Sequence, residues 1–402
     1  MTVVEARLLG TAAALAFPRR AGSDGDRAVT AALAERLEAL GFVVEVEAFS
    51  FDRQPAERGL RWLLGGTALA VVGASWLAVA APLAALGLLA AAAAGTLVVL
   101  RRAPWLDALY RRPGPVRSAN VVGRRATELP ERCVVLVAHH DSKSQNLAMP
   151  ARLAATIGAG VGAGGVAALA VAATVIDGTG PPAWLAGSAG AVAGLCLAAL
   201  ASMTSGDASP GGVDNAGSMA VVLELAAGAR ALPPGLELVV LFTGAEEDRM
   251  VGATRWLDRH REALAGAAPV VLNFDGAGSP GRTVLITRSG LGRRLAPGLE
   301  RTALAAAADL GERPRRIAMA PAVGIDALPF AERGIECLTL TSGSLGPATF
   351  AVHSAGDVAG NLDGPTLVRV VELARAILGR LEAEDGTGTH QSSTEKPTGG
   401  TT

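Results

Sequence analysis

The sequence contains few aromatic residues, cysteines or histidines. Phe, Trp and Tyr make up 3% of the 402 residues, and the chain has three Cys and five His. Cys133, Cys196 and Cys337 are far apart and lie within apolar runs. This spacing is not that of the disulfide framework of a small secreted domain, and it fits buried thiols in a reducing compartment.

The sequence also lacks an excess of charge of either sign. There are 36 Lys and Arg against 37 Asp and Glu, which gives a formal net charge of −1. The basic residues form no stripe or patch interleaved with aromatic residues, as nucleic-acid binding would require. We therefore expect no nucleic-acid partner.

What the chain does have is long apolar runs. Half of the residues are apolar and the mean hydropathy is +0.36, more apolar than an ordinary soluble protein. The stretch Trp62–Leu100 holds no charged residue over 39 positions, about twice the roughly 20 that one membrane helix needs. Pro82 lies near its middle, so the pattern predicts a hairpin of two membrane-spanning helices. Trp62 and Trp105 lie near its ends, as interfacial anchors do.

A second apolar block lies further along the chain. The runs Leu153–Ile176 and Ala183–Met203 are separated by a turn-rich loop at residues 177–182. Gly158 and Gly162 in the first run have the small-xxx-small spacing that allows close helix packing in lipid. We predict a second membrane hairpin here, with a Gly/Ala-rich soluble segment as the alternative.

Each predicted hairpin begins and ends on the same side of the membrane. Arg58 and Arg61 precede the first hairpin, Arg101 and Arg102 follow it, and neither turn carries Lys or Arg. Positive residues mark the cytoplasmic side. The sequence therefore predicts a multi-pass protein of the cell (inner) membrane, in contact with the lipid bilayer, with its remaining domain on the cytoplasmic side.

The rest of the chain alternates strand and helix patterns. This order implies an α/β fold in which a mostly parallel or mixed sheet carries helices on both faces. The predicted strands are Phe42–Phe51, Cys133–Ala138, Leu236–Phe242, Val270–Phe274, Thr283–Thr287 and Glu336–Leu340. The predicted helices are Asp24–Gly41, Ser218–Ala229, Ala253–Leu264, Leu291–Leu310 and Thr366–Ala383.

These patterns predict one discontinuous domain interrupted by the hairpins. Residues 1–58, 103–150 and 206–383 would form the domain, residues 59–102 the first hairpin and residues 151–205 the second. From position 384 the chain is rich in Gly, Thr, Ser and charge, which predicts a disordered tail over residues 384–402.

Polar residues follow several of the apolar, strand-like runs. The run that ends at Ala138 is followed by His139-His140-Asp141. Side chains alternate along a strand, so His139 and Asp141 would point one way and His140 the other. A carboxylate that holds the second ring nitrogen of a metal-bound imidazole is a common arrangement. We read His140 as a packed residue, and His260, on a charged helix, as solvated.

Four further segments carry side chains of the metal-ligand type. They are Asp214-Asn215 before a helix, Glu246-Glu247 and Asp275 after strands, and His353. Taken alone, Asp214 would be a helix cap and Asp275 part of an Asp-Gly turn. Taken together, most of these segments fall at one edge of a parallel sheet, where an α/β fold builds its site. Imidazoles and carboxylates in this mixture suit a hydrolytic metal pair.

These segments resemble the metal-site motifs of the co-catalytic di-zinc aminopeptidases. That superfamily includes bacterial leucyl aminopeptidases, glutamate carboxypeptidase and the transferrin receptor. The matching segments are Ala138-His-His-Asp-Ser142, Gly212-Val-Asp-Asn215, Glu246-Glu247, Asn273-Phe-Asp275 and His353-Ser-Ala-Gly-Asp357. The resemblance covers most of residues 15–383 outside the apolar blocks, and it implies the three-layer sandwich of the zinc exopeptidases. Both hairpins replace connections in that pattern.

The resemblance also implies a role for each site residue. Asp214 would bridge two zinc ions. His139 and Asp275 would complete the protein ligands of one ion. Glu247 and His353 would complete those of the other. Glu246 would act as the general base, and Asp141 would orient His139.

The function implied by the resemblance is that of a metallopeptidase, most directly an aminopeptidase acting on peptides with a free N-terminus. One alternative is other zinc chemistry at an amide, such as carboxypeptidase action or glutaminyl cyclisation. A full ligand set around Asp214 favours two metals and argues against a one-metal cyclase. The second alternative is a catalytically inactive scaffold of the same fold, against which the retention of Glu246 and all five ligand positions argues.

Overall fold

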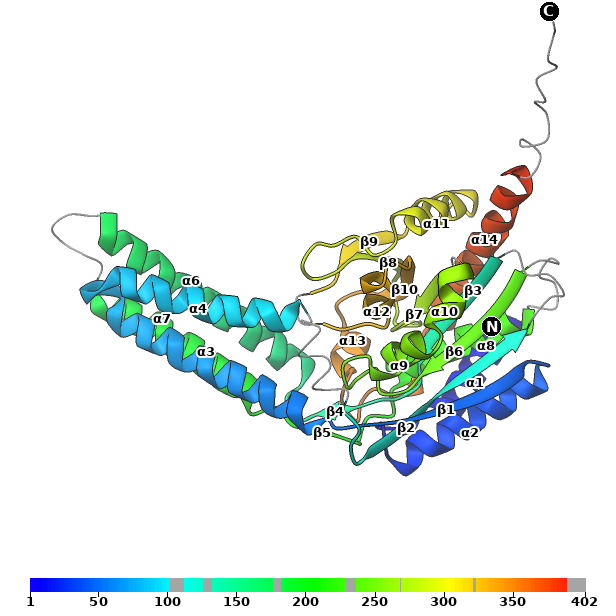
Figure 1. The fold of residues 1–402 in the computed structure, drawn as a ribbon, viewed down its shortest axis with the longest axis horizontal. Coiled ribbons are helices and arrows are strands. Elements are labelled where there is room, and N and C mark those ends of the chain that lie inside the picture. The colour runs from blue at the N-terminus through cyan, green and yellow to red at the C-terminus, as the bar shows by residue number, and fades with distance from the viewer. Residues whose placement is uncertain are drawn as a thin grey trace, which may run out of the picture.

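An eight-stranded sheet forms the centre of the protein (Figure 1), in the order β1-β2-β6-β3-β7-β10-β8-β9. The structure is a computed structural model that describes residues 1–101, 112–125, 132–175, 182–228, 236–267, 269–320 and 323–388. The strands are β1 (Val43–Phe51), β2 (Val116–Arg125), β3 (Arg132–His139), β6 (Leu236–Thr243), β7 (Val270–Phe274), β8 (Arg282–Arg288), β9 (Arg315–Ala318) and β10 (Cys337–Gly343). Two short strands, β4 (Ser144–Gln145) and β5 (Ser205–Gly206), pair separately.

The sheet is mixed, as the sequence predicts. β3 lies between β6 and β7 and runs parallel to both, and β10 runs parallel to β7. The pairings of β1 with β2, β2 with β6 and β8 with β10 are antiparallel. The carboxyl ends of β3, β6, β7 and β10 therefore meet at one edge of the sheet.

Helices cover both faces of the sheet because its central strands are apolar on both sides. In β3, Leu136 and Ala138 face one core, whereas Val135 and Val137 face the other. The first core is closed by α1 (Val3–Leu15), α2 (Asp24–Ala39), α8 (Gly217–Gly228), α11 (Pro297–Asp309) and α14 (Gly364–Gly388). The second is closed by α9 (Val251–Arg259), α10 (Arg261–Ala267) and α12 (Ala327–Glu332). The result is the predicted three-layer sandwich.

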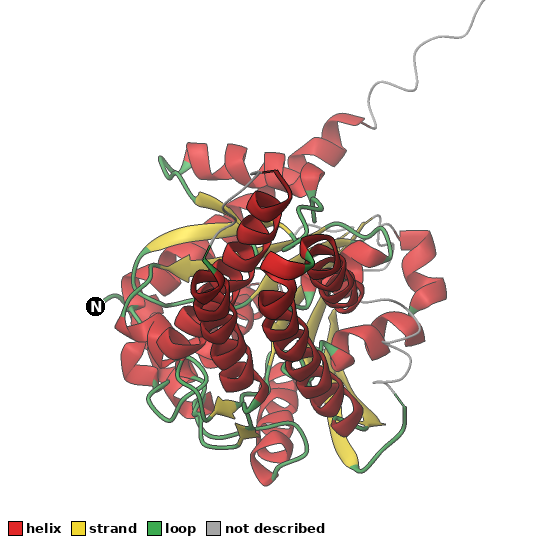
Figure 2. Cartoon of the chain, turned by 90° about the vertical axis from the view of Figure 1, so that its left-hand side faces the viewer, coloured by secondary structure: helices red, strands yellow, loops and turns green. Residues whose placement is uncertain are grey.

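The two apolar blocks form four long helices. They are α3 (Gln54–Ala80), α4 (Pro82–Leu100), α6 (Met149–Val175) and α7 (Ala183–Ala201). The helices project together from one side of the sheet domain (Figure 1), and Figure 2 looks along the bundle. All four are long and apolar enough to cross a membrane. α3, with 27 residues, is about 40 Å long, which exceeds a hydrocarbon core of about 30 Å.

The bundle has small residues inside and large apolar residues outside. Its interior holds Ala74, Ala159 and Ala193, whereas Trp76 is 82% exposed. The helices approach closely, because a Cβ atom on Gly162 of α6 would lie 2.6 Å from the carbonyl oxygen of Ala189 in α7. This pattern suits packing in lipid, where small residues bring helices together.

Several element boundaries differ from the sequence-based expectations. Strands β2 and β9 were not expected, and the helix expected from Leu291 begins only at Pro297, after a turn in which Gly292 has a φ of +82°. α14 extends to Gly388, into the expected tail. Residues 389–402 of that tail, most of the loop at residues 177–182, and Trp105 lie outside the described residues.

Candidate metal centre

The expected site residues gather at the carboxyl edge of the central strands. His139 ends β3, Glu246 and Glu247 follow β6, and Asp275 follows β7. The other two ligand-type residues come from connecting segments. Asp214 lies just before α8, and His353 follows the short helix α13 (Pro347–Ala351) with a left-handed φ of +63°. A non-glycine residue in that conformation is uncommon and often marks a functional position.

Asp214 lies between two groups of ligand atoms. Its Oδ1 is 3.0 Å from Nε2 of His139, which is also 3.7 Å from Oδ1 of Asp275. Its Oδ2 is 3.1 Å from Nε2 of His353, which is 2.9 Å from Oε1 of Glu247. Within each group the ligand atoms all lie within 4.8 Å of one another. The carboxylate of Asp214 therefore offers one oxygen atom to each group.

The second nitrogen of each imidazole faces a polar partner outside the ligand groups. Nδ1 of His139 lies 3.1 Å from the carbonyl oxygen of Asp141, and Nδ1 of His353 lies 3.1 Å from Oε1 of Gln145. The acceptor opposite Nδ1 of His139 places the hydrogen on that nitrogen, so Nε2 of His139 presents its lone pair to the site. Nδ1 of His353 faces both an acceptor and a donor, Nη1 of Arg152 at 3.2 Å, so its contacts are compatible with a hydrogen on either nitrogen. A lone pair that faces carboxylate oxygens is repelled unless a proton or a metal ion lies between them.

The chemistry of these residues fits a metal ion. Burial opposes protonation of His139, but the surrounding carboxylates, Asp141 first, raise its pKa well above the usual value. Oε1 of Glu247 is buried, and its neighbour in the site is Nε2 of His353 at 2.9 Å. Both observations indicate a site that favours a cation. Imidazole nitrogen and carboxylate oxygen are ligands that Zn²⁺ accepts in hydrolytic centres.

Asp141 contacts more than His139. Its carboxylate accepts hydrogen bonds from the backbone N–H groups of Glu246 at 3.0 Å and Glu247 at 3.2 Å. Its Oδ1 also lies 3.6 Å from Nδ1 of His139, whose nearer acceptor is the Asp141 carbonyl oxygen. Asp141 thus links the end of β3 to the loop that carries both glutamates.

Glu246 belongs to neither ligand group, although it lies beside them. Its side chain is buried, and burial together with the charges of Glu247 and Asp275 raises its pKa well above the usual value. Asp326 lies nearby, where burial raises its pKa to about 7, and it accepts a hydrogen bond from Thr243. The carboxyl group of Glu246, which is buried and has a raised pKa, is suited to accept and release a proton.

Three residues that hold the Asp214 loop carried no expected role. Asp357 accepts hydrogen bonds from the backbone N–H groups of Val213 at 2.8 Å and Asp214 at 3.2 Å. Asn215 donates to the carbonyl oxygen of Phe274 at 3.1 Å and accepts from the N–H of Gly276 at 3.1 Å. Arg19 is buried and donates to the carbonyl oxygens of Phe17, His140, Pro210 and Gly211. Asp357 and Asn215 lie within the sequence motifs described above, and that position could have indicated a role in the site.

Three further residues reach the site from the base of the second hairpin. Nζ of Lys143 lies 2.7 Å from Oε2 of Glu247. Arg152, in the first turn of α6, donates to Oε1 of Gln145, the atom that also faces Nδ1 of His353. The long apolar helix is thereby connected to one of the ligand-type histidines.

His140 and His260 lie away from the ligand groups, and His390 lies outside the described residues. Nε2 of His140 is 2.9 Å from the carbonyl oxygen of Ala119, and the residue is buried, as the strand alternation predicts. The expectation that His260 is solvated is wrong. Its Nε2 lies 2.6 Å from Oε1 of Glu47, a residue of β1, and its side chain is 17% exposed.

Solved structures with the same fold include bacterial aminopeptidases and glutaminyl cyclases. An aminopeptidase from Aneurinibacillus sp. strain AM-1 is 14% identical, with a TM-score of 0.56 and 93% of each chain covered. BSAP, a zinc aminopeptidase from Bacillus subtilis, is 14% identical, with a TM-score of 0.55 and 94% of each chain covered. A glutaminyl cyclase from Fimbriiglobus ruber is also 14% identical, with a TM-score of 0.55, and covers 93% of this chain and 94% of its own.

Residues 199–378 match the model of peptidase family M28. The match confirms the resemblance to the zinc aminopeptidases that the motifs indicate, and the protein has an M28 zinc peptidase-like fold. Among curated proteins, none matches the chain.

The M28 match contains most of the ligand-type residues, namely Asp214, Glu247, Asp275 and His353, together with Glu246. His139 lies outside it, on the far side of the second hairpin. The fold nevertheless brings His139 to within 3.0 Å of Asp214.

Proposed function

We propose that the protein is a membrane-anchored zinc peptidase that removes residues from the N-terminus of peptides. The observation that carries this proposal is the position of Asp214, whose two carboxylate oxygens face two separate groups of imidazole and carboxylate ligands. His139 and Asp275 would hold one Zn²⁺ with Asp214, and Glu247 and His353 would hold the second. When bound, such a pair lowers the pKa of water and polarises the scissile carbonyl group.

Glu246 is the proposed general base. Its buried carboxyl group lies beside both ligand groups without belonging to either, and its raised pKa favours the acceptance of a proton. It would take a proton from the attacking water and deliver it to the amine that leaves when the peptide bond breaks. Asp141 would hold Glu246 in place through the hydrogen bond to its backbone N–H.

The four long helices are the proposed membrane anchor. Their length and apolar composition support this role, as do the outward-facing Trp76 and Leu69, which are among the most exposed large apolar residues. We place the catalytic domain on the cytoplasmic side, because Arg58, Arg61 and Arg101 flank the helix ends nearest that domain.

The proposal is tested with detergent-purified protein, its Glu246→Gln variant and a panel of aminoacyl amides and peptides. We expect two zinc ions per chain in both proteins, release of N-terminal residues by the wild type, and a loss of at least about 100-fold in kcat for the variant, as expected for a general base. Blocking the N-terminus of a peptide by acetylation would abolish hydrolysis by an aminopeptidase but not by a carboxypeptidase.

The same panel separates the two alternatives. Release of ammonia from a peptide with N-terminal glutamine, without hydrolysis of the others, would assign the glutaminyl cyclase activity that is named for some of the similar structures. Two bound zinc ions without turnover of any substrate would favour an inactive scaffold. A chain that binds no metal at all would overturn the site as described.

A further inference from the structure

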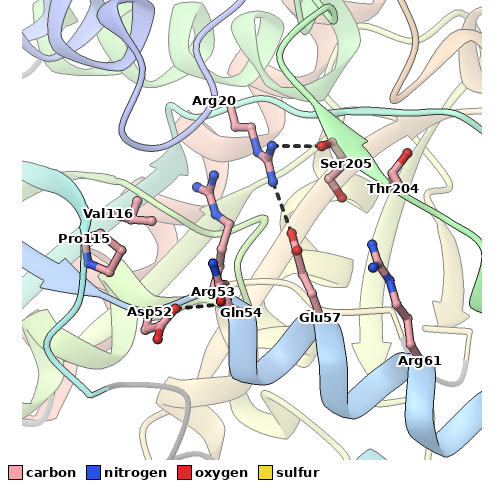
Figure 3. A pocket seen from close by; sticks show the side chains of 10 residues that line it. All are labelled: Arg20, Asp52, Arg53, Gln54, Glu57, Arg61, Pro115, Val116, Thr204 and Ser205. Carbon is pink, nitrogen blue, oxygen red and sulfur yellow. Dashed lines mark hydrogen bonds and ion pairs between the residues drawn. The ribbon is translucent and has the colours of Figure 1, made fainter.

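A charged cavity lies where the helical bundle meets the sheet domain (Figure 3). Its volume is about 370 Å³, and its walls come from the segment before α2, from the start of α3, and from the residues after α7. The lining residues used below are Arg20, Arg53, Glu57, Arg61, Thr204 and Ser205. The cavity is separate from the candidate metal centre, since none of its lining residues belongs to either ligand group.

The cavity lies at the border of the apolar segments. Arg61 immediately precedes the uncharged run of α3 that begins at Trp62, and Thr204 follows the end of α7 at Ala201 by three positions. Trp62 is 80% exposed, as expected for an interfacial anchor. If α3 and α7 cross the bilayer, the cavity lies at the level of the lipid headgroups.

Three guanidinium groups converge on this cavity (Figure 3). Arg20 is paired with Glu57 at 3.2 Å, and Arg53 is paired with Asp248 at 2.9 Å. Burial and the charge of Arg53 both lower the pKa of Arg20, so the two cations repel each other. Within the described residues, Arg61 has no carboxylate partner and makes a long hydrogen bond of 3.4 Å to the carbonyl oxygen of Met203. An anion in the cavity would relieve the repulsion and pair with Arg61.

The start of α3 already has a carboxylate at its first N–H group. The helix has 27 residues and begins at Gln54, whose N–H donates to Oδ1 of Asp52 at 3.0 Å. The N-terminus of a helix favours negative charge. The carboxylates of Asp52 and Glu57 also line the cavity, and they disfavour an ion with two or more negative charges. The lining therefore suits a singly charged phosphodiester better than inorganic phosphate, which carries up to two charges near neutral pH.

We infer that this cavity binds the phosphodiester headgroup of a membrane phospholipid, with Arg61 as the principal contact. The inference rests on the membrane anchoring in the proposed function. Such a contact would fix the depth and tilt of α3 at the membrane surface. It would also hold the base of the hairpins against the sheet domain, because Arg20 joins α3, through Glu57, to the carbonyl oxygen of Ser205 at 2.8 Å.

The test compares short-chain phosphatidylglycerol below its micelle concentration with dihexanoylglycerol, which lacks the phosphate, and with inorganic phosphate at equal ionic strength. The unfolding temperature of the detergent-purified wild type should rise and saturate with phosphatidylglycerol only. Arg61→Ala should weaken the apparent affinity by at least about tenfold, and Arg61→Lys should lose less. Arg58→Ala is the matched control, since Arg58 is exposed, lies on the same helix and does not line the cavity, although it bonds the lining residue Gln54 at 2.6 Å.

Each other outcome overturns the inference in a distinguishable way. An equal effect of inorganic phosphate would make the cavity a site for free anions. An equal response of the Arg61→Ala and Arg58→Ala proteins would show a general lipid effect. Extraction of washed membranes with carbonate addresses the anchoring itself: release of the chain would overturn the membrane anchor, whereas retention without any response to phosphatidylglycerol would overturn the lipid site alone.

Discussion

At the scale of single residues, the candidate centre depends on side chains that hold its ligands as well as on the ligands themselves. Asp357 accepts two backbone N–H bonds from the segment that presents Asp214. It is fully buried, and burial raises its pKa to about 6. Removal of its charge should loosen the loop, because hydrogen bonds to ionised acceptors are stronger than neutral ones.

We therefore predict that Asp357→Asn weakens zinc binding by about 10- to 100-fold, the usual effect of changing a group that supports a ligand. Zinc affinity is measured by competition with a chelating dye. Asp309→Asn is the control, because Asp309 is 59% exposed and pairs with Arg380 at the surface. Equal zinc affinities in the two variants would contradict the assigned role of Asp357.

A second prediction concerns the partner of His353. Gln145→Leu removes the oxygen atom that faces Nδ1 of His353 and should loosen the orientation of the ring. We expect a loss of about 10- to 100-fold in zinc affinity, whereas Gln145→Glu, which keeps an oxygen acceptor, should bind zinc more tightly than Gln145→Leu. If the leucine variant binds zinc as tightly as the wild type, another group must orient His353.

The types of ligand could be predicted from sequence, but their supporting contacts could not. His139, Glu247 and Asp275 stand at or just after the ends of apolar strand patterns, which local sequence reveals. Arg152 is different. It lies 201 positions before His353 and looks like an ordinary basic residue before an apolar helix. Contacts of that range depend on the tertiary fold, which no local pattern encodes.

At the scale of elements, α6 links the bundle to the metal centre. Arg152 donates to the same oxygen of Gln145 that faces His353. We predict that Arg152→Met lowers zinc affinity in the wild type and has a smaller effect in Gln145→Leu, because Arg152 contacts both Gln145 and, at 3.2 Å, Nδ1 of His353. A double-mutant cycle measures this coupling. Additive losses would show that Arg152 acts on the site by another route.

The packing of α6 against α7 predicts different effects for substitutions at two glycines of α6. A Cβ atom on Gly162 would lie 2.6 Å from the carbonyl oxygen of Ala189, whereas one on Gly160 would meet nothing within 4 Å. Gly162→Leu should destabilise the hairpin by about 1–3 kcal/mol, the usual cost of overpacking. Gly160→Leu should have little effect on the unfolding temperature in detergent. Equal effects of the two substitutions would mean that α6 and α7 do not pack in this way.

The elements that local sequence missed are those whose pattern is dictated by distant partners. β2 contains Ser118 and Asn120, which are buried although polar. Asn120 donates to the carbonyl oxygen of Gly252 and accepts from the N–H of Gly244, so its polarity is satisfied by the loop after β6. A strand with such residues lacks the apolar run that reveals β3 and β7.

At the scale of the whole molecule, the hairpins leave and return to one side of the sheet domain (Figure 1). Both ends of each hairpin therefore lie on the same side of any membrane that the bundle crosses. The turn between α3 and α4, at Ala81, must then lie on the opposite side from α2. The orientation of the protein in the membrane can therefore be tested by labelling one residue near this turn and one residue of α2.

The native cysteines should react little with a thiol reagent, because Cys133 and Cys337 are buried and Cys196 is half-buried in the bundle. We predict that Leu83→Cys, next to the turn and 76% exposed, reacts with a membrane-impermeant thiol reagent in intact cells. Glu38→Cys, on the exposed face of α2, should react only after the cells are permeabilised. The reverse pattern would place the catalytic domain outside the cell, where Zn²⁺ and peptide substrates would come from a different compartment. Reaction of both positions in intact cells would show that the bundle does not span the membrane, since α2 and the turn would then share one side.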